Sequence, residues 1–172
     1  MRWMWIDRIV ELVPREKLVA IKNVSLAEEH LHDHFAQTER HAAFAVMPAS
    51  LIIEGMAQSA GILVGHAEGF REKVILAKVT RAELECDAVP GDALRYCAQI
   101  EQLTTQGAST RGVVELLKPT TVGEERSART IGRIDLMFSH IDHNMAGTNF
   151  PEHNFVFSSS LMTLLRTSGL SD

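Results

Sequence analysis

The chain has 172 residues, enough for one domain with a substantial core, and its hydrophobic content of 45% is that of an ordinary globular protein. Its net charge of -5 argues against general nucleic-acid binding, which requires a basic face. Cys86 and Cys97 form no metal-type pair and are typical of buried residues in a reduced cytoplasm, where we expect the protein to reside. Met1 leads into an aromatic segment rather than a signal peptide.

The first part of the chain predicts short elements before one long helix. Residues 6–12 form either a short helix or a strand edge, which Pro14 ends. Residues 17–25 are apolar and β-branched with polar interruptions, which indicates a strand. Residues 28–44 are polar and rich in histidine, and we interpret them as a loop.

Residues 48–68 predict the long helix around which the chain is organised. Pro48 suits the first turn, Gly69 can stop the helix, and apolar residues cover most of its circumference, so we expect burial all round. Glu54 is its only ionisable residue before His66, and Gln58, four residues later, can hydrogen-bond to it. Glu54, Gln58, two serines and three glycines make the run too polar for a membrane span.

The remainder predicts a run of strands and then a tail. Strand patterns cover residues 73–79, 82–89, 92–103, 110–118 and 127–138. Short turns join them, which favours an antiparallel meander that curls about the helix in an α+β fold. We assign residues 1–138 to a single domain. Residues 139–172 form a tail with a short amphipathic helix, which we expect to cover an apolar surface of this subunit or of its neighbour.

The densest polar cluster, residues 28–35, leaves three interpretations open. An extended backbone would project His30, His32 and His34 to one side, as in a metal site, although the spacing matches no specific zinc signature. A solvated loop without a role is the second interpretation. In the third, His34 pairs with Glu54 for acid–base chemistry.

Several motifs resemble those of the β-hydroxyacyl-acyl-carrier-protein dehydratases, in the right order over about residues 5–138. The matching segments are Asp33-His34-Phe35, residues 46–58 with Met47-Pro48 and Ala57-Gln58, residues 6–12, residues 20–25, and Pro90-Gly91-Asp92. The resemblance implies the hot-dog fold, a long helix wrapped by a curved antiparallel sheet. Ala36-Gln37 replaces the family's Pro-Gly, Ala49 replaces a glycine, and the loop from His34 to Met47 is longer by about six residues.

The resemblance implies dehydration of a 3-hydroxyacyl thioester, with catalytic residues His34 as base and Glu54 as acid. His41, in the enlarged loop, is the alternative partner of Glu54; His34 is preferred because Phe35 follows it. The amides of Ala49 and Ser50 would stabilise charge on the thioester oxygen. Gln58 would orient Glu54, and Pro48 would fix the helix start. No metal or organic cofactor is required.

The resemblance also implies partners. Subunits of the family pair as homodimers, and the histidine and the acid of one site come from different chains; a higher oligomer stays open. An acyl-carrier protein is acidic, so we expect a basic docking patch, with Arg71, Lys73, Lys78 and Arg81 as candidates. Two alternatives remain: a hot-dog thioesterase that uses a carboxylate-activated water, and a non-catalytic protein that binds acyl chains.

Overall fold

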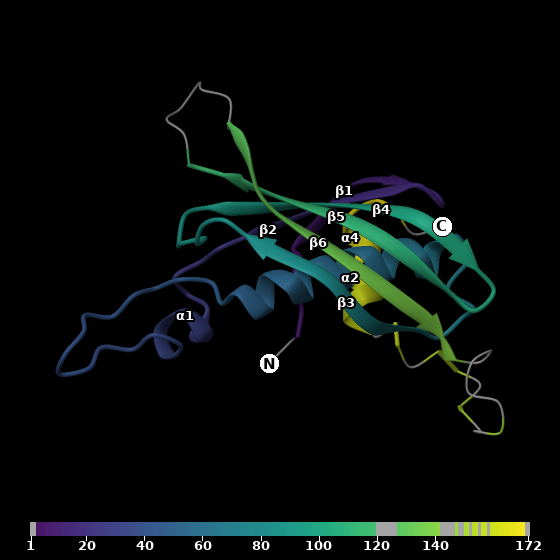
Figure 1. Cartoon of the computed structure of the whole chain (residues 1–172), viewed down its shortest axis with the longest axis horizontal. Helices are drawn as coiled ribbons and strands as arrows, with labels where there is room; N and C mark the ends of the chain where they lie inside the picture. The colour runs from purple at the N-terminus through teal and green to yellow at the C-terminus, as the bar shows by residue number, and fades with distance from the viewer. Residues whose placement is uncertain are drawn as a thin grey trace.

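The computed structural model describes residues 3–119, 127–141, 147, 150–151, 153–154, 156–157 and 159–170. The strands are β1 (Arg8–Val13), β2 (Lys17–Asn23), β3 (Val74–Leu84), β4 (Ala93–Thr104), β5 (Gly107–Leu117) and β6 (Ala128–His140). The helices are α1 (Glu29–Asp33), α2 (Ala49–Ala67) and α4 (Ser159–Thr167). Figure 1 shows the sheet crossing over α2, with α4 close to the same helix.

The long helix is confirmed, with Pro48 as its N-cap residue rather than its first helical residue. The fixed φ of proline, −57° here, suits this entry, and its carbonyl accepts hydrogen bonds from the Leu51 and Ile52 amides. The helix ends before Gly69, which adopts φ +61°, a left-handed conformation that glycine tolerates without a steric cost.

The strands form one antiparallel sheet in the order β1-β2-β4-β5-β6-β3. The predicted meander is therefore correct only for β4, β5 and β6, because β3 crosses to the far edge and pairs with β6 instead of β4. The two strands predicted at 73–79 and 82–89 are one strand, β3, with register shifts between Leu76 and Lys78 and between Val79 and Arg81. Of the segment 6–12, residues 8–12 belong to strand β1, and none of it is helical.

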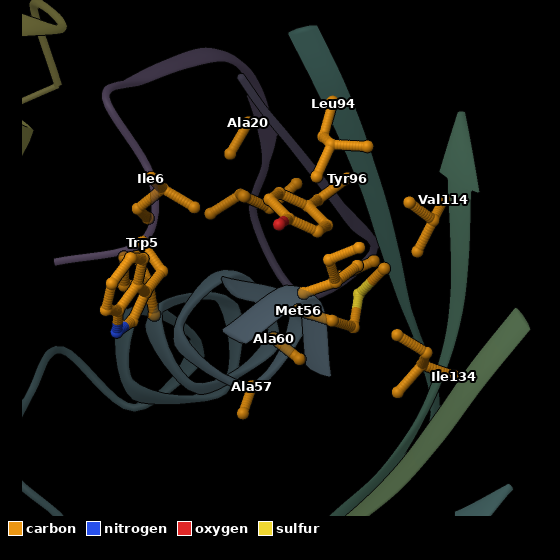
Figure 2. Close-up of a cluster of buried hydrophobic side chains, with 14 of the residues drawn as sticks. Trp5, Ile6, Ala20, Met56, Ala57, Ala60, Leu94, Tyr96, Val114 and Ile134 are labelled. Atoms are coloured by element: carbon orange, nitrogen blue, oxygen red, sulfur yellow. The ribbon is translucent and has the colours of Figure 1, made fainter. Parts of the chain in front are cut away.

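The core lies between α2 and the concave face of the sheet (Figure 2). Met56 and Ala60 of the helix face Tyr96 and Ile134 of the strands, and all four are buried. Glycine makes this approach possible, because a Cβ at Gly55 would lie 2.5 Å from the Tyr96 hydroxyl oxygen. A Cβ at Gly112 would lie 2.5 Å from both the Met56 sulfur and the Ile134 carbonyl oxygen.

The C-terminal tail packs on this subunit. Its short helix, α4, was expected from the apolar spacing, and Leu161, Leu164 and Leu165 are its buried residues. The Ile9 amide donates to the Ser168 hydroxyl at 3.0 Å, which fixes the end of the tail to β1. The described residues of the tail therefore cover apolar surface beside α2.

Candidate functional site

One face of α2 is open, which corrects the expectation that the helix is buried all round. Leu51, Glu54, Gln58 and Gly61 recur at spacings of three and four residues, so they share a face, and each is half-buried. The opposite face, with Met56, Leu63 and Val64, is fully buried. Glu54 and Gln58 thus lie where a ligand can approach.

Gln58 connects the Glu54 carboxylate to the N-terminal segment. The amide nitrogen of Gln58 donates to Glu54 Oε1 and to the Trp3 carbonyl oxygen, both at 3.0 Å. Its amide oxygen accepts from the Trp5 backbone N–H at 2.9 Å. Three bonds with distinct donor and acceptor roles fix the orientation of the amide, so the Glu54 carboxylate is held from one side.

The Glu54 cavity, of about 290 Å³, runs along this open face. Glu54 and Gln58 supply its ionisable and amide side chains, and the other lining residues are apolar or glycine. They come from α2 itself, from the N-terminal segment, from strands β3 and β6, and from the C-terminal tail, which contributes Val156, Phe157 and Leu161. Sequence analysis missed the tail residues, because nothing in their pattern says which surface they cover.

The His34 cavity, of about 480 Å³, lies at the N-terminal end of α2. His34, His30, Pro48, Ser50 and Leu51 line it, together with Glu28, Glu29 and the N-terminal segment. Trp3 and Met4 line both cavities, so the N-terminal segment lies between them. Within one chain, His34 and Glu54 therefore line different cavities.

The two backbone amides that we expect to bind a thioester oxygen lie at the start of helix α2. Ala49 and Ser50 are the first two helical residues, whose N–H groups have no acceptor within a helix. Both residues are exposed. Ser50 lines the His34 cavity, whereas Ala49 lines a separate cavity together with Leu84, the last residue of β3, and Cys86, which follows that strand.

The two candidate histidines differ in their surroundings. His34 caps the end of α1, is exposed, and packs edge-to-face on Phe35 with ring centroids 4.3 Å apart. His41 is exposed in the loop, where its carbonyl accepts from the Thr38 amide at 2.9 Å. His41 lines neither the Glu54 cavity nor the His34 cavity, as far as the described residues define them.

His30 was considered in the sequence analysis only as a candidate metal ligand, but it lines the His34 cavity. Its ring packs edge-to-face on Trp5, with centroids 4.9 Å apart, and burial lowers the pKa of its imidazole from the usual value. Its Nε2 atom is buried and has no hydrogen-bond partner among the described residues. The spacing of four between His30 and His34 was the available signal, since it puts both on one side of a helical turn.

The helical backbone of α1 contradicts the extended arrangement on which the metal interpretation depended. The His34 amide donates to the His30 carbonyl at 3.1 Å, as in a helix. The His32 side chain lies outside the described part of the structure. Within the described residues, no group of three or more His, Cys, Asp or Glu side chains is arranged to hold a metal ion.

The four candidate docking residues are not equally accessible. Arg71, Lys78 and Arg81 are exposed, and Arg81 pairs with Glu83 at 2.6 Å. Lys73 is buried, with 6% of its surface exposed, so its ammonium group is not part of an accessible patch. In the described part of the chain, no helix is long and apolar enough to cross a membrane.

The architecture is that of the hot-dog fold, and solved structures with this fold superpose on it. AziG of S. sahachiroi gives a TM-score of 0.54 at 11% identity, covering 77% of this chain and 89% of AziG. A mutant acyl-CoA hydrolase of Staphylococcus aureus gives a TM-score of 0.54 at 14% identity, covering 89% of this chain and 87% of the hydrolase. At these identities the similarity concerns the fold alone.

Sequence similarity identifies the family of this chain, which the fold alone does not. The model of the FabA-like domain matches residues 2–118, and the chain belongs to this family. It is 34% identical over 99 residues to the 3-hydroxyacyl-[acyl-carrier-protein] dehydratase FabZ of Ruminiclostridium cellulolyticum, covering 57% of this chain and 66% of that protein. It is 41% identical over 96 residues to FabZ of Acidiphilium cryptum, covering 54% of each chain. The matches thus span less than two thirds of these relatives.

Proposed function

We propose that this protein dehydrates a 3-hydroxyacyl thioester, linked to an acyl-carrier protein, to the trans-2-enoyl thioester in acyl-chain biosynthesis. One observation carries the proposal: in a FabA-like domain, the Glu54 carboxylate is held by Gln58 at an otherwise apolar cavity. An acyl chain requires such apolar walls, and elimination of water requires an acid beside them. The two free cysteines agree with a cytoplasmic location.

In the proposed reaction, neutral His34 removes the α-proton of the thioester. The electron pair of the broken C–H bond forms the double bond, and the C–O bond of the 3-hydroxyl breaks. Glu54 gives its proton to the departing oxygen, which leaves as water. The free amides at the start of α2, those of Ser50 and Ala49, stabilise the negative charge that develops on the thioester oxygen. This scheme uses only groups of the chain itself.

We further propose that a complete site combines two chains of a homodimer. Within one chain, Trp3 and Met4 lie between the cavity of His34 and the cavity of Glu54. For His34 and Glu54 of one chain to meet, the N-terminal segment would have to move. If His34 instead comes from a second copy of the chain, this movement is not needed. The same pairing would repeat on the other side, because a twofold interface is self-complementary.

The first experiment measures enoyl thioester by absorbance with 3-hydroxyacyl thioesters on the carrier protein, for the parent and for His34→Ala. We expect the variant to lose about 10²–10⁴ of the rate, the usual contribution of a general base. His41→Ala is the matched control and should keep parent activity. Release of free thiol without enoyl product would instead identify a thioesterase, and binding without turnover would identify a non-catalytic acyl-binding protein.

A mixing experiment tests the two-chain site. His34→Ala and Glu54→Gln chains are inactive alone in this scheme, but a mixed dimer contains one site with both native residues. Random mixing in equal amounts should therefore restore about a quarter of parent activity. No recovery, with mixed dimers demonstrated by differently tagged chains, would mean that each site is built from one chain.

A further inference from the structure

The C-terminal segment is fixed against the end of α2 by one side chain. The Asn154 amide nitrogen donates to the carbonyl oxygens of Phe70 and Glu72, both at 2.9 Å. Its oxygen accepts from the Val156 backbone N–H at 3.1 Å. Because the amide satisfies two carbonyls of the turn after α2, it sets where the following residues lie.

Phe157 follows this anchor and rests on a glycine of the helix. A Cβ atom at Gly65 would overlap the Phe157 ring, so the ring occupies space that a side chain would otherwise fill. Phe70 packs edge-to-face on the same ring, with centroids 4.9 Å apart. The ring is thus held by a glycine on one side and by an aromatic residue on another.

The Glu54 cavity therefore has a polar part and an aromatic boundary. Glu54 and Ile62 both line it and are eight residues apart, which corresponds to about 12 Å along a helix. Phe157, seated on Gly65 one turn further, lines the cavity together with Val156 and Leu161. Its volume of about 290 Å³ lies at the lower limit of small-molecule pockets, about 300–1,000 Å³.

We propose that the C-terminal segment closes the acyl-chain cavity and that Phe157 sets the longest chain that fits. This inference rests on the proposed function, because it assumes that an acyl thioester presents its polar end to Glu54. The occupant is a hydrocarbon chain, since the walls beyond Glu54 and Gln58 are apolar. In this proposal, Val156, Phe157 and Leu161 of the C-terminal segment determine specificity as well as covering part of α2.

A substitution at Gly61 should reduce the volume of the cavity, the opposite of the effect expected from shortening Phe157. Gly61 lines the cavity, and a Cβ there would meet only the Phe138 ring at 3.5 Å, an ordinary contact distance. Alanine at this position therefore fits the structure while its methyl group takes space from the chain. Phe157→Ala enlarges the cavity and Gly61→Ala reduces it, so the two variants should shift the preferred chain length in opposite directions.

The test measures binding of saturated acyl-N-acetylcysteamine thioesters, with four to twelve carbons, by calorimetry. In the parent, each added methylene should tighten binding about fourfold until the cavity is full, after which the gain stops. Phe157→Ala and the milder Phe157→Leu should move this limit to longer chains, and Gly61→Ala should move it to shorter ones. Met162→Ala, an exposed residue of α4, is the matched control and should leave the limit unchanged.

Each outcome decides the inference. A limit that stays constant in folded Phe157→Leu and Gly61→Ala, or a parent that binds no chain, overturns it. If Phe157→Ala does not fold, as judged by circular dichroism, the Leu and Gly61 variants still carry the test. Saturated thioesters cannot be dehydrated, so shifted binding without dehydratase activity would retain the chain-length role and reject the proposed reaction. Dehydratase activity with an unchanged chain-length limit would instead retain the proposed reaction and reject the chain-length role of Phe157.

Discussion

The two faces of helix α2 differ in how closely they are packed, although their residues alternate along the chain. On the sheet face, Gly55 and Met56 touch strands so closely that a Cβ at Gly55 would lie 2.5 Å from the Tyr96 hydroxyl. On the open face, Glu54 and Gly61 border a cavity, and a Cβ at Gly61 would find its nearest neighbour at 3.5 Å. The same helix is therefore tightly packed on one side and borders a cavity on the other.

This difference explains how a carboxylate is tolerated in an apolar helix. Glu54 lies on the open face of α2, is half-buried, and is bonded to Gln58, so it does not bear the cost of full burial without a partner. The strongly packed sheet face keeps the helix in place while the open face is left incompletely filled. Substitutions on the two faces should then affect different measurements.

The largest effect is expected from Glu54→Gln, which keeps the shape of the side chain but removes the acid. Dehydratase activity should fall about 10²–10⁴-fold, the usual contribution of a general acid. The thermal unfolding temperature should change little, because the open face carries few packing contacts. A large fall in unfolding temperature together with the loss of activity would show that Glu54 is mainly structural. It would also contradict the idea that the open face contributes little to stability.

The next largest effect is a difference in unfolding free energy between alanine substitutions at two glycines, one closely packed and one beside the cavity. Gly112→Ala places a methyl group against the Met56 sulfur and the Ile134 carbonyl, and should cost about 3 kcal/mol of unfolding free energy. Gly61→Ala should instead be neutral or add up to about 1 kcal/mol, because alanine favours a helix. Urea denaturation of both variants measures the difference. Equal losses in the two would mean that the open face is packed as tightly as the sheet face.

A smaller effect is expected from Gln58→Ala. The substitution leaves the Trp3 carbonyl, the Trp5 N–H and the Glu54 carboxylate without this partner, at a cost of about 1–2 kcal/mol. Activity should fall less than in Glu54→Gln, because the acid remains but is no longer oriented. Gln99→Ala, exposed on β4, is the control for both measurements. An unchanged stability would show that the N-terminal segment is held by other contacts.

The sequence predicted the elements whose pattern is local. The long helix, the strands with alternating residues, and the contact between Glu54 and Gln58 all follow from spacing along one element. The position of β3 beside β6 was not predicted, because its pairing depends on a crossover that no short pattern encodes. The open face was missed for a similar reason: apolar residues around the whole helix do not reveal which of them the sheet covers.

The candidate site was predicted in part for the same physical reason. His34 and Ser50 line one cavity and Glu54 lines another, and the N-terminal segment between the two cavities could not be foreseen. Trp3 and Trp5 reach α2 through hydrogen bonds to Gln58, a contact across more than fifty residues of chain. Phe157 was equally hidden, because its role depends on the space left by Gly65.

The smallest effect concerns the pH dependence of stability on the open side. Burial lowers the pKa of His30 below the usual 6.5; the Glu28 carboxylate opposes this shift, and the Lys22 ammonium group acts in the same direction as burial. The folded protein therefore prefers neutral His30. Its contribution is complete above pH 6.5 and is lost as the pH falls below that value, because the unfolded chain then binds the proton more readily.

His30→Phe should make the unfolding temperature fall less between pH 7.5 and pH 5.5 than it does in the parent. Phenylalanine keeps an aromatic ring against Trp5, whose centroid lies 4.9 Å from that of His30, but it has no titrating group. His41→Phe, at an exposed loop position, is the control and should retain the parent's pH response. An identical response in His30→Phe would show that the environment of His30 does not favour its neutral form, and the packing between α1 and the N-terminal segment would then need another explanation.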